Sequence, residues 1–158
     1  MNLVVIPGFQ QEPESSPLKE VSDALEPYFS DIEFIEWPQD KYGKSLFEEK
    51  VLNNIEEESV ILGHSLGATI GLSLISRQEV LGMIAFDPIR KAIDDNKNEL
   101  RIDKVSCKKP LLVFDSESEQ IDIPEGNFER KKIETNHFFE NSEKEIKEKS
   151  RNWVEENV

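Results

Sequence analysis

The sequence predicts an α/β fold, with a mostly parallel central sheet of about six strands and helices on both faces. Two observations predict it. Short apolar runs without strict alternation recur along the chain, and such runs are typical of strands buried on both faces. Segments with helical spacing lie between them, as the crossover connections of parallel strands require. We expect one domain over residues 1–158, because this length can bury a hydrophobic core of its own.

The first predicted strand covers residues 3–6, an apolar run that ends at Pro7 and Gly8. Further apolar runs predict strands at residues 32–35, 59–62, 83–86, 111–114 and 128–133. The last of these alternates imperfectly. Turn-forming residues bound most of the runs, and Asp87-Pro88 closes the fourth.

Helices are expected between these strands. The first follows Ser16-Pro17, a helix-capping residue with proline at the first helical position. Apolar spacing then predicts helices over residues 46–55 and 66–76, and one helix within the polar segment 89–106. A last helix follows Ser142, and residues 146, 153 and 154 give it one apolar face.

The composition limits the classes of function. Acidic residues outnumber basic ones by 33 to 19, which gives a formal net charge of −14. A nucleic acid would be repelled by this charge, so we expect no nucleic-acid partner. The single cysteine, Cys107, cannot form an internal disulfide. The apolar run at the N-terminus is too short for a signal peptide or a membrane span, so we expect a cytosolic protein with no membrane association.

The chemistry concentrates at residues 63–67, which read Gly-His-Ser-Leu-Gly and form a G-x-S-x-G motif. The apolar run 59–62 precedes it, and a helix rich in small residues follows. A serine on so tight a strand-to-helix turn adopts a strained backbone, so its neighbours two positions away must be small. The turn raises the Ser65 hydroxyl above the sheet edge, where a base can reach it.

Strand, motif and small-residue helix together resemble the nucleophile elbow of the α/β-hydrolase superfamily. Three other segments occur in the order that this family uses. Residues 4–9 resemble the strand and loop that supply an oxyanion-hole amide, although Pro7 replaces the usual histidine. Residues 110–114 resemble the strand whose exit carries the catalytic acid, and residues 136–139 resemble the surroundings of the catalytic histidine. The resemblance covers nearly the whole chain and implies the minimal fold without its first two strands and without a lid domain.

The resemblance implies a role for each matching residue. Ser65 would be the nucleophile, and His137 would be the base that takes its proton. The backbone amides of Leu66 and Phe9 would form the oxyanion hole. We expect the side chain of the other histidine, His64, to point away from the reacting centre.

The acid is the least determined member of the predicted triad. Counted from the end of the strand at 111–114, Glu119 falls where the resemblance implies the acid. Asp115, closer to the strand, is the alternative, and Glu117 and Asp87 rank behind these two.

The sequence thus predicts a serine hydrolase that cleaves carboxylic esters or thioesters of small acyl substrates through an acyl-enzyme on Ser65. Two alternatives stay open: a catalytically inactive binding protein on the same fold, and an acyltransferase of that fold. We expect no cofactor and no metal, because two histidines far apart in the sequence form no ligand cluster. The partner is a small acyl substrate, and the sequence does not determine an oligomeric state.

Overall fold

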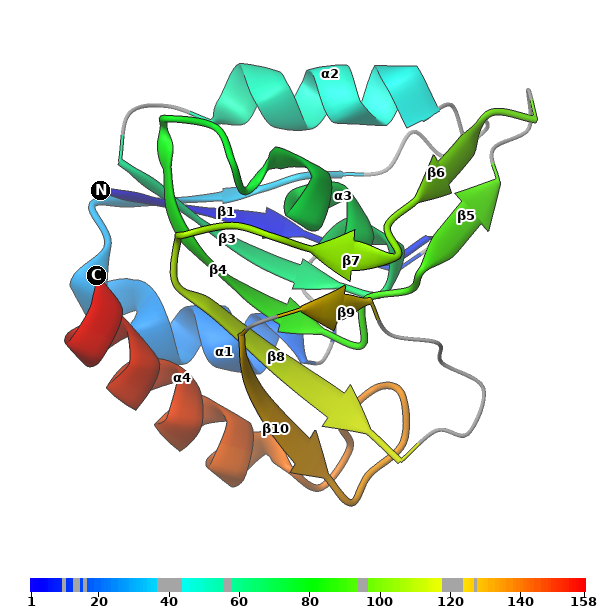
Figure 1. Ribbon diagram of the computed structural model, residues 1–158. Coiled ribbons are helices and arrows are strands. Elements are labelled where there is room, and N and C mark those ends of the chain that lie inside the picture. Colours follow the sequence, from blue (N-terminus) through cyan, green and yellow to red (C-terminus); the bar gives the residue numbers. More distant parts are fainter. Residues whose placement is uncertain are drawn as a thin grey trace.

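The computed structural model describes residues 1–9, 11–12, 15, 17–36, 44–55, 58–93, 97–117, 124–126 and 128–158. Its centre is a six-stranded sheet with the strand order β10-β8-β4-β3-β1-β2 (Figure 1). The strands are β1 (Asn2–Ile6), β2 (Asp31–Phe34), β3 (Ser59–His64), β4 (Val80–Phe86), β8 (Leu111–Ser116) and β10 (Glu129–Ile133). Every neighbouring pair in this sheet is parallel, which confirms the predicted fold class.

Helices cover both faces of the sheet. They are α1 (Leu18–Leu25), α2 (Lys44–Asn54), α3 (Leu66–Leu74) and α4 (Glu143–Asn157), and the 3₁₀ turn η1 (Glu26–Tyr28) extends α1. Figure 1 shows α2 and α3 on one face and α1 and α4 on the other. Up to β4 the helices alternate with the strands along the chain, as parallel crossover connections commonly do.

The burial of β1 shows why its sequence does not alternate between apolar and polar residues. Successive side chains of a strand point to opposite faces. Val4 and Ile6 belong to the core under α2 and α3, whereas Leu3 and Val5 belong to the core under α1 and α4. Both cores need apolar side chains, so a central strand is apolar at every position.

The prediction of a helix within residues 89–106 is wrong. The described residues of this segment form a hairpin of β5 (Lys91–Ile93) and β6 (Glu99–Arg101), and then β7 (Lys104–Val105), which pairs with β9 (Glu125–Gly126). Leu100 is buried between two exposed neighbours and faces Ala92 across the hairpin. This two-residue period belongs to a strand, but it is too short to stand out in a polar segment.

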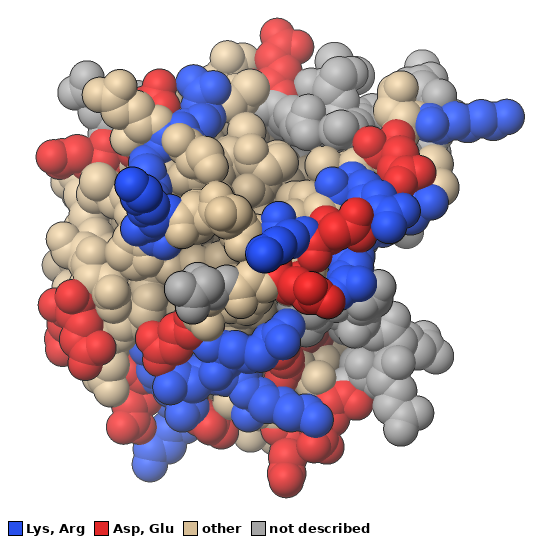
Figure 2. Space-filling model, viewed as in Figure 1, with Lys and Arg blue, Asp and Glu red and all other residues tan. Residues whose placement is uncertain are grey.

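The strand β10 lies at one edge of the sheet and carries three consecutive basic residues, Arg130, Lys131 and Lys132. Figure 2 shows Lys and Arg side chains gathered over this strand, in a molecule that is acidic as a whole. Charged residues on an edge strand oppose pairing with another chain. Among the described helices, none has the length and the apolar character that crossing a membrane requires.

Candidate active site

Ser65 lies at the junction of β3 and α3, where it is the N-cap residue of the helix. Its backbone has φ 52° and ψ −118°, a conformation that residues other than glycine rarely adopt. The Ser65 amide donates a hydrogen bond to the carbonyl of Phe86 on the neighbouring strand, at 2.8 Å. The strand and the helix therefore hold the serine in a sharp turn at the carboxyl edge of the sheet.

The two glycines of the motif allow this turn to pack closely. A Cβ atom at Gly63 would lie 2.7 Å from the Cα of Ala68, and one at Gly67 would lie 2.2 Å from the carbonyl oxygen of Ile6. Real Cβ atoms essentially never come this close to backbone atoms. The small residues expected on either side of Ser65 are thus required by contacts with β1 and α3.

His137 lies in the loop between β10 and α4, and its imidazole is held by Asp87. Its Nδ1 is 2.9 Å from Oδ2 of Asp87. Asp87 is fully buried directly after β4, and Ser116 at the end of β8 holds it in place. The Ser116 amide donates to Oδ1 at 2.7 Å, and the Ser116 hydroxyl donates to Oδ2.

This arrangement differs from the predicted choice of acid. Glu119 lies outside the described residues. Asp115 does not contact His137 but pairs with Arg130, with its Oδ2 2.6 Å from Nε of that arginine. Glu117 is exposed. The carboxylate on the imidazole belongs to Asp87, which the sequence ranked behind these residues because the family register was counted from the end of β8.

Asp115 is close enough to Asp87 for their charges to interact, but it has no hydrogen bond to His137. Burial raises the pKa of its carboxyl to about 6, and the nearby Asp87 acts in the same direction, whereas Arg130 opposes the shift. Its Oδ1 has no hydrogen-bond partner among the described residues. Asp115 is therefore a poorly compensated carboxylate, which would orient an imidazole less well than Asp87 does.

The aromatic residues around His137 fix its loop. Phe139, which is fully buried, packs edge-on against Phe86 with the ring centroids 5.0 Å apart. Since Phe86 directly precedes Asp87, this contact places the histidine loop above the acid. Phe138 is half exposed, and its ring lies 5.5 Å from that of His137.

The loop after β1 approaches the nucleophile closely. A Cβ at Gly8 would lie 3.2 Å from Cβ of Ser65, so no larger residue fits without a shift. Phe9 follows in this loop, with half of its surface exposed. Leu66 is the first residue of α3, and the amides of a first helical turn have no acceptor within the helix. The loop and the helix start thus flank Ser65 from two sides.

His64 was expected to point away from the reacting centre, but its ring lies against that of His137. The two ring centroids are 4.5 Å apart. His64 Nε2 is 2.8 Å from the carbonyl oxygen of His137, and Nδ1 is 2.6 Å from Oε1 of Gln11. Burial, aided by the nearby His137, lowers the pKa of His64 to about 4. Neither this bridge nor the Ser116 contact has a signature in the sequence, because its members are far apart along the chain.

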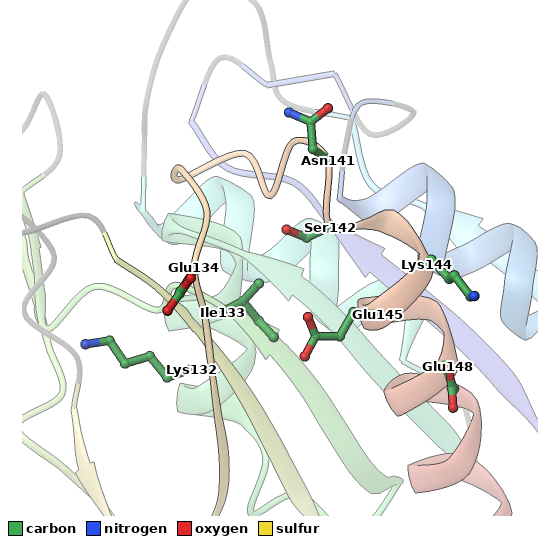
Figure 3. A pocket seen from close by; sticks show the side chains of 8 residues that line it. All are labelled: Lys132, Ile133, Glu134, Asn141, Ser142, Lys144, Glu145 and Glu148. Carbon is green, nitrogen blue, oxygen red and sulfur yellow. The ribbon is translucent and has the colours of Figure 1, made fainter.

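A hollow lies between the end of β10 and α4, and neither Ser65 nor His137 is among the residues that line it (Figure 3). It is lined by Lys132, Ile133, Glu134, Asn141, Ser142, Lys144, Glu145 and Glu148. Its lining is polar and charged, and Figure 3 shows Glu134 and Glu145 on opposite sides of it. It contains no member of the triad and adds nothing to the site above.

Comparison with known proteins identifies the fold. No protein-family model and no curated protein matches the sequence. Among solved structures, Est1E from Butyrivibrio proteoclasticus matches with a TM-score of 0.71 and 11% identity, over 99% of this chain and 87% of that one.

Two further solved structures agree with this match. The mouse alpha/beta hydrolase domain-containing protein 10 has a TM-score of 0.74 and 9% identity, over 99% of this chain and 90% of that one. An alpha-beta serine hydrolase homologue from Coxiella burnetii has a TM-score of 0.65 and 16% identity, over 96% of this chain and 83% of that one. Together with the strand order and the elbow at Ser65, these likenesses show that the chain has the α/β-hydrolase fold.

Proposed function

We propose that this protein is a serine hydrolase that cleaves carboxylic esters or thioesters of small acyl substrates. Ser65 would be the nucleophile, His137 the base, and Asp87 the acid that orients the base. The observation that carries the proposal is the elbow conformation of Ser65, whose neighbour His64 contacts a histidine held at Nδ1 by a buried carboxylate. This combination is the recurring constellation of acyl-transfer enzymes.

The contacts support a defined sequence of steps. With Nδ1–H donated to Asp87, the Nε2 of His137 carries a lone pair and can accept the proton of the Ser65 hydroxyl. The Ser65 oxygen then attacks the carbonyl carbon, and the protonated imidazole returns the proton to the leaving alcohol or thiol. A water molecule then gives a proton to His137 and attacks the carbonyl carbon of the acyl-enzyme. His137 returns the proton to the Ser65 oxygen, and the carboxylic acid product is released.

The oxyanion is assigned to backbone amides on both sides of the serine. The amide of Leu66 begins α3, and the positive end of a helix dipole favours negative charge there. The second amide is that of Phe9, on the loop whose glycine packs against Ser65. The described residues between β4 and β8 include a short hairpin and no helix that could serve as a lid, which favours small acyl groups as substrates.

The first test is labelling with a fluorophosphonate probe, read by intact mass. Wild-type protein should gain one adduct, and Ser65→Ala should gain none. Ser73→Ala is a matched control, because Ser73 is an exposed serine on the same helix. It should be labelled like the wild type.

The outcome separates the alternatives. A folded wild type without an adduct would contradict the proposal and leave a binding protein on this fold. An adduct on both the wild type and Ser65→Ala would place the reactive serine elsewhere. Where labelling depends on Ser65, short-chain and long-chain acyl esters and thioesters then define the substrate, and slow hydrolysis that an added alcohol or amine accelerates would indicate acyl transfer instead.

A further inference from the structure

A chain of contacts runs beneath Ser65 from the loop after β1 to the loop that carries His137. The Gly8 amide donates to Oε1 of Gln11 at 2.8 Å. The same oxygen lies 2.6 Å from Nδ1 of His64, and Nε2 of His64 lies 2.8 Å from the carbonyl oxygen of His137. His64 is 1% exposed, so water does not replace these partners. The residue beside the nucleophile thus connects both loops that flank it.

When His64 is neutral, this chain of contacts has one hydrogen-bond donor too few for its acceptors. A backbone N–H can only donate, so Gly8 fixes the amide oxygen of Gln11 toward His64. The carbonyl of His137 can only accept. Both ring nitrogens of His64 therefore face acceptors, and a neutral imidazole has a single N–H to give. Only the doubly protonated ring can bind both loops at once.

We propose that His64 is a positioning residue that ties the histidine loop and the loop after β1 to the nucleophile elbow. The neutral ring donates its single N–H to one loop at a time, and the doubly protonated ring donates to both. The inference builds on the proposed function, because it assigns positions to the base and to the oxyanion loop of that site.

The surroundings of His64 determine which form is present. Burial and the nearby His137 both oppose the second proton, whereas Asp87 and the bond to the His137 carbonyl favour it. Since the pKa of His64 is lowered to about 4, the neutral ring is the working form near neutral pH. In that form, a hydrogen bond from Nε2 to the His137 carbonyl keeps the base in place, and Nδ1 then has no proton to donate to Gln11. A bond from Nδ1 does the reverse.

Two substitutions at His64 separate the two bonds. In His64→Gln the side-chain NH₂ reaches the place of Nε2, so the bond to the His137 carbonyl is kept. In His64→Asn the NH₂ stands near the place of Nδ1, so that bond is lost. We expect His64→Asn to lower kcat on the order of 100-fold with little change in KM, since misplacing a base by about 1 Å has this effect. His64→Gln should keep most of the wild-type kcat.

Gln11→Glu tests the bond count without relying on activity. A carboxylate accepts from both Gly8 and Nδ1, so it should raise the pKa of His64 above that of the wild type. The chain has only two histidines, which makes their imidazole nitrogens separable by ¹⁵N NMR titration. Gln78→Glu, at an exposed glutamine, is the matched control and should leave the titration of His64 unchanged.

The results distinguish this inference from the proposed function. Unchanged kcat in a folded His64→Asn, or an unshifted His64 titration in Gln11→Glu, would overturn the inference even where the probe labels Ser65. If Ser65 is not labelled, the proposed function fails, and the titration of Gln11→Glu still decides whether Gln11 faces His64 as described. Thermal unfolding of each variant verifies that it folds, and where His64→Asn does not fold, the titration of His64 in Gln11→Glu decides the inference.

Discussion

Asp87 has the contacts that a triad acid needs. Its two carboxylate oxygens receive the Ser116 amide, the Ser116 hydroxyl and the His137 imidazole, and no part of the residue is exposed. A buried carboxylate that accepts several hydrogen bonds keeps its orientation. Ser116 is thus a positioning residue for the acid, on the strand next to the one that Asp87 follows.

We expect Asp87→Asn to lower kcat on the order of 10⁴-fold, because an amide NH₂ facing Nδ1 favours the wrong tautomer of His137. The measurement is kcat for an activated ester. Asp115→Asn is the control, since it changes a neighbouring carboxylate that Arg130 already binds, and Glu119→Ala tests the residue chosen from the sequence. Both should keep kcat near the wild type. A large loss in Glu119→Ala with normal kcat in Asp87→Asn would reverse the assignment.

At this scale the sequence points to candidate residues that have a local motif, but it cannot choose among carboxylates whose role depends on geometry. Ser65 stands in a five-residue motif and His137 is one of two histidines, so both were identifiable. The acid is selected by which carboxylate lies near the imidazole, and in an acidic chain many candidates fit a sequence register. The contact between Asp87 and Ser116 spans 29 residues and leaves no local pattern.

At the scale of elements, the elbow depends on how closely α3 packs against β1. A Cβ at Gly67 would meet the backbone carbonyls of Ile6 and Pro7 at 2.2 and 2.3 Å. A Cβ at Gly71, one turn later, would meet only side chains, with the terminal methyl of Met83 at 2.6 Å and Cγ2 of Ile61 at 2.9 Å. Backbone atoms of a central strand cannot yield, whereas the end of a methionine side chain can move.

Gly67→Ala should therefore lower the free energy of unfolding by about 3 kcal/mol or more. Gly71→Ala should be less costly, because its clashes are with side chains and alanine in a helix gains about 1 kcal/mol over glycine, which offsets part of the crowding. Denaturant titration of both variants measures the difference. Equal losses would mean that the contact between α3 and β1 is looser than described.

The elements themselves were predicted unevenly, for a physical reason. The inner strands β1, β3, β4 and β8 each contain a continuous apolar run, and this signal does not depend on neighbouring strands. The segment after β4 is polar, and its strands are two or three residues long and stable only by pairing, Ala92 with Leu100 and Lys104 with Glu125. Strands this short show too few residues for their two-residue period to be recognised, so the sequence predicts a helix where a hairpin forms.

At the scale of the whole molecule, the order of apolar runs and helices was enough to predict the fold, because parallel strands with crossover helices allow few arrangements. The strand order and the neighbours among solved structures agree with that prediction. The charge of −14 is the other property of the whole chain, and the sequence alone gives it. Figure 2 shows that basic side chains gather over β10, so the excess acidic charge lies on other surfaces.

This charge excess should make stability depend on salt. Like charges repel one another in the compact state, and this repulsion lowers the free energy of unfolding. The screening length falls from about 30 Å at 0.01 M salt to about 10 Å at 0.1 M, a change that screens most of the repulsion across a small domain. We expect Tm to rise by about 2–4 °C over this range, the shift that about 1 kcal/mol produces in a chain of this size.

A charge variant separates this repulsion from other effects of salt. Glu26 and Glu33 are exposed residues outside the site, and changing both to lysine raises the net charge by four units, from −14 to −10. The double variant should have a higher Tm than the wild type at 0.01 M salt and a smaller increase on going to 0.1 M, because less repulsion remains to be screened. Differential scanning calorimetry of both proteins at both salt concentrations gives the four Tm values. An identical increase in both proteins would show that the salt effect does not come from net charge.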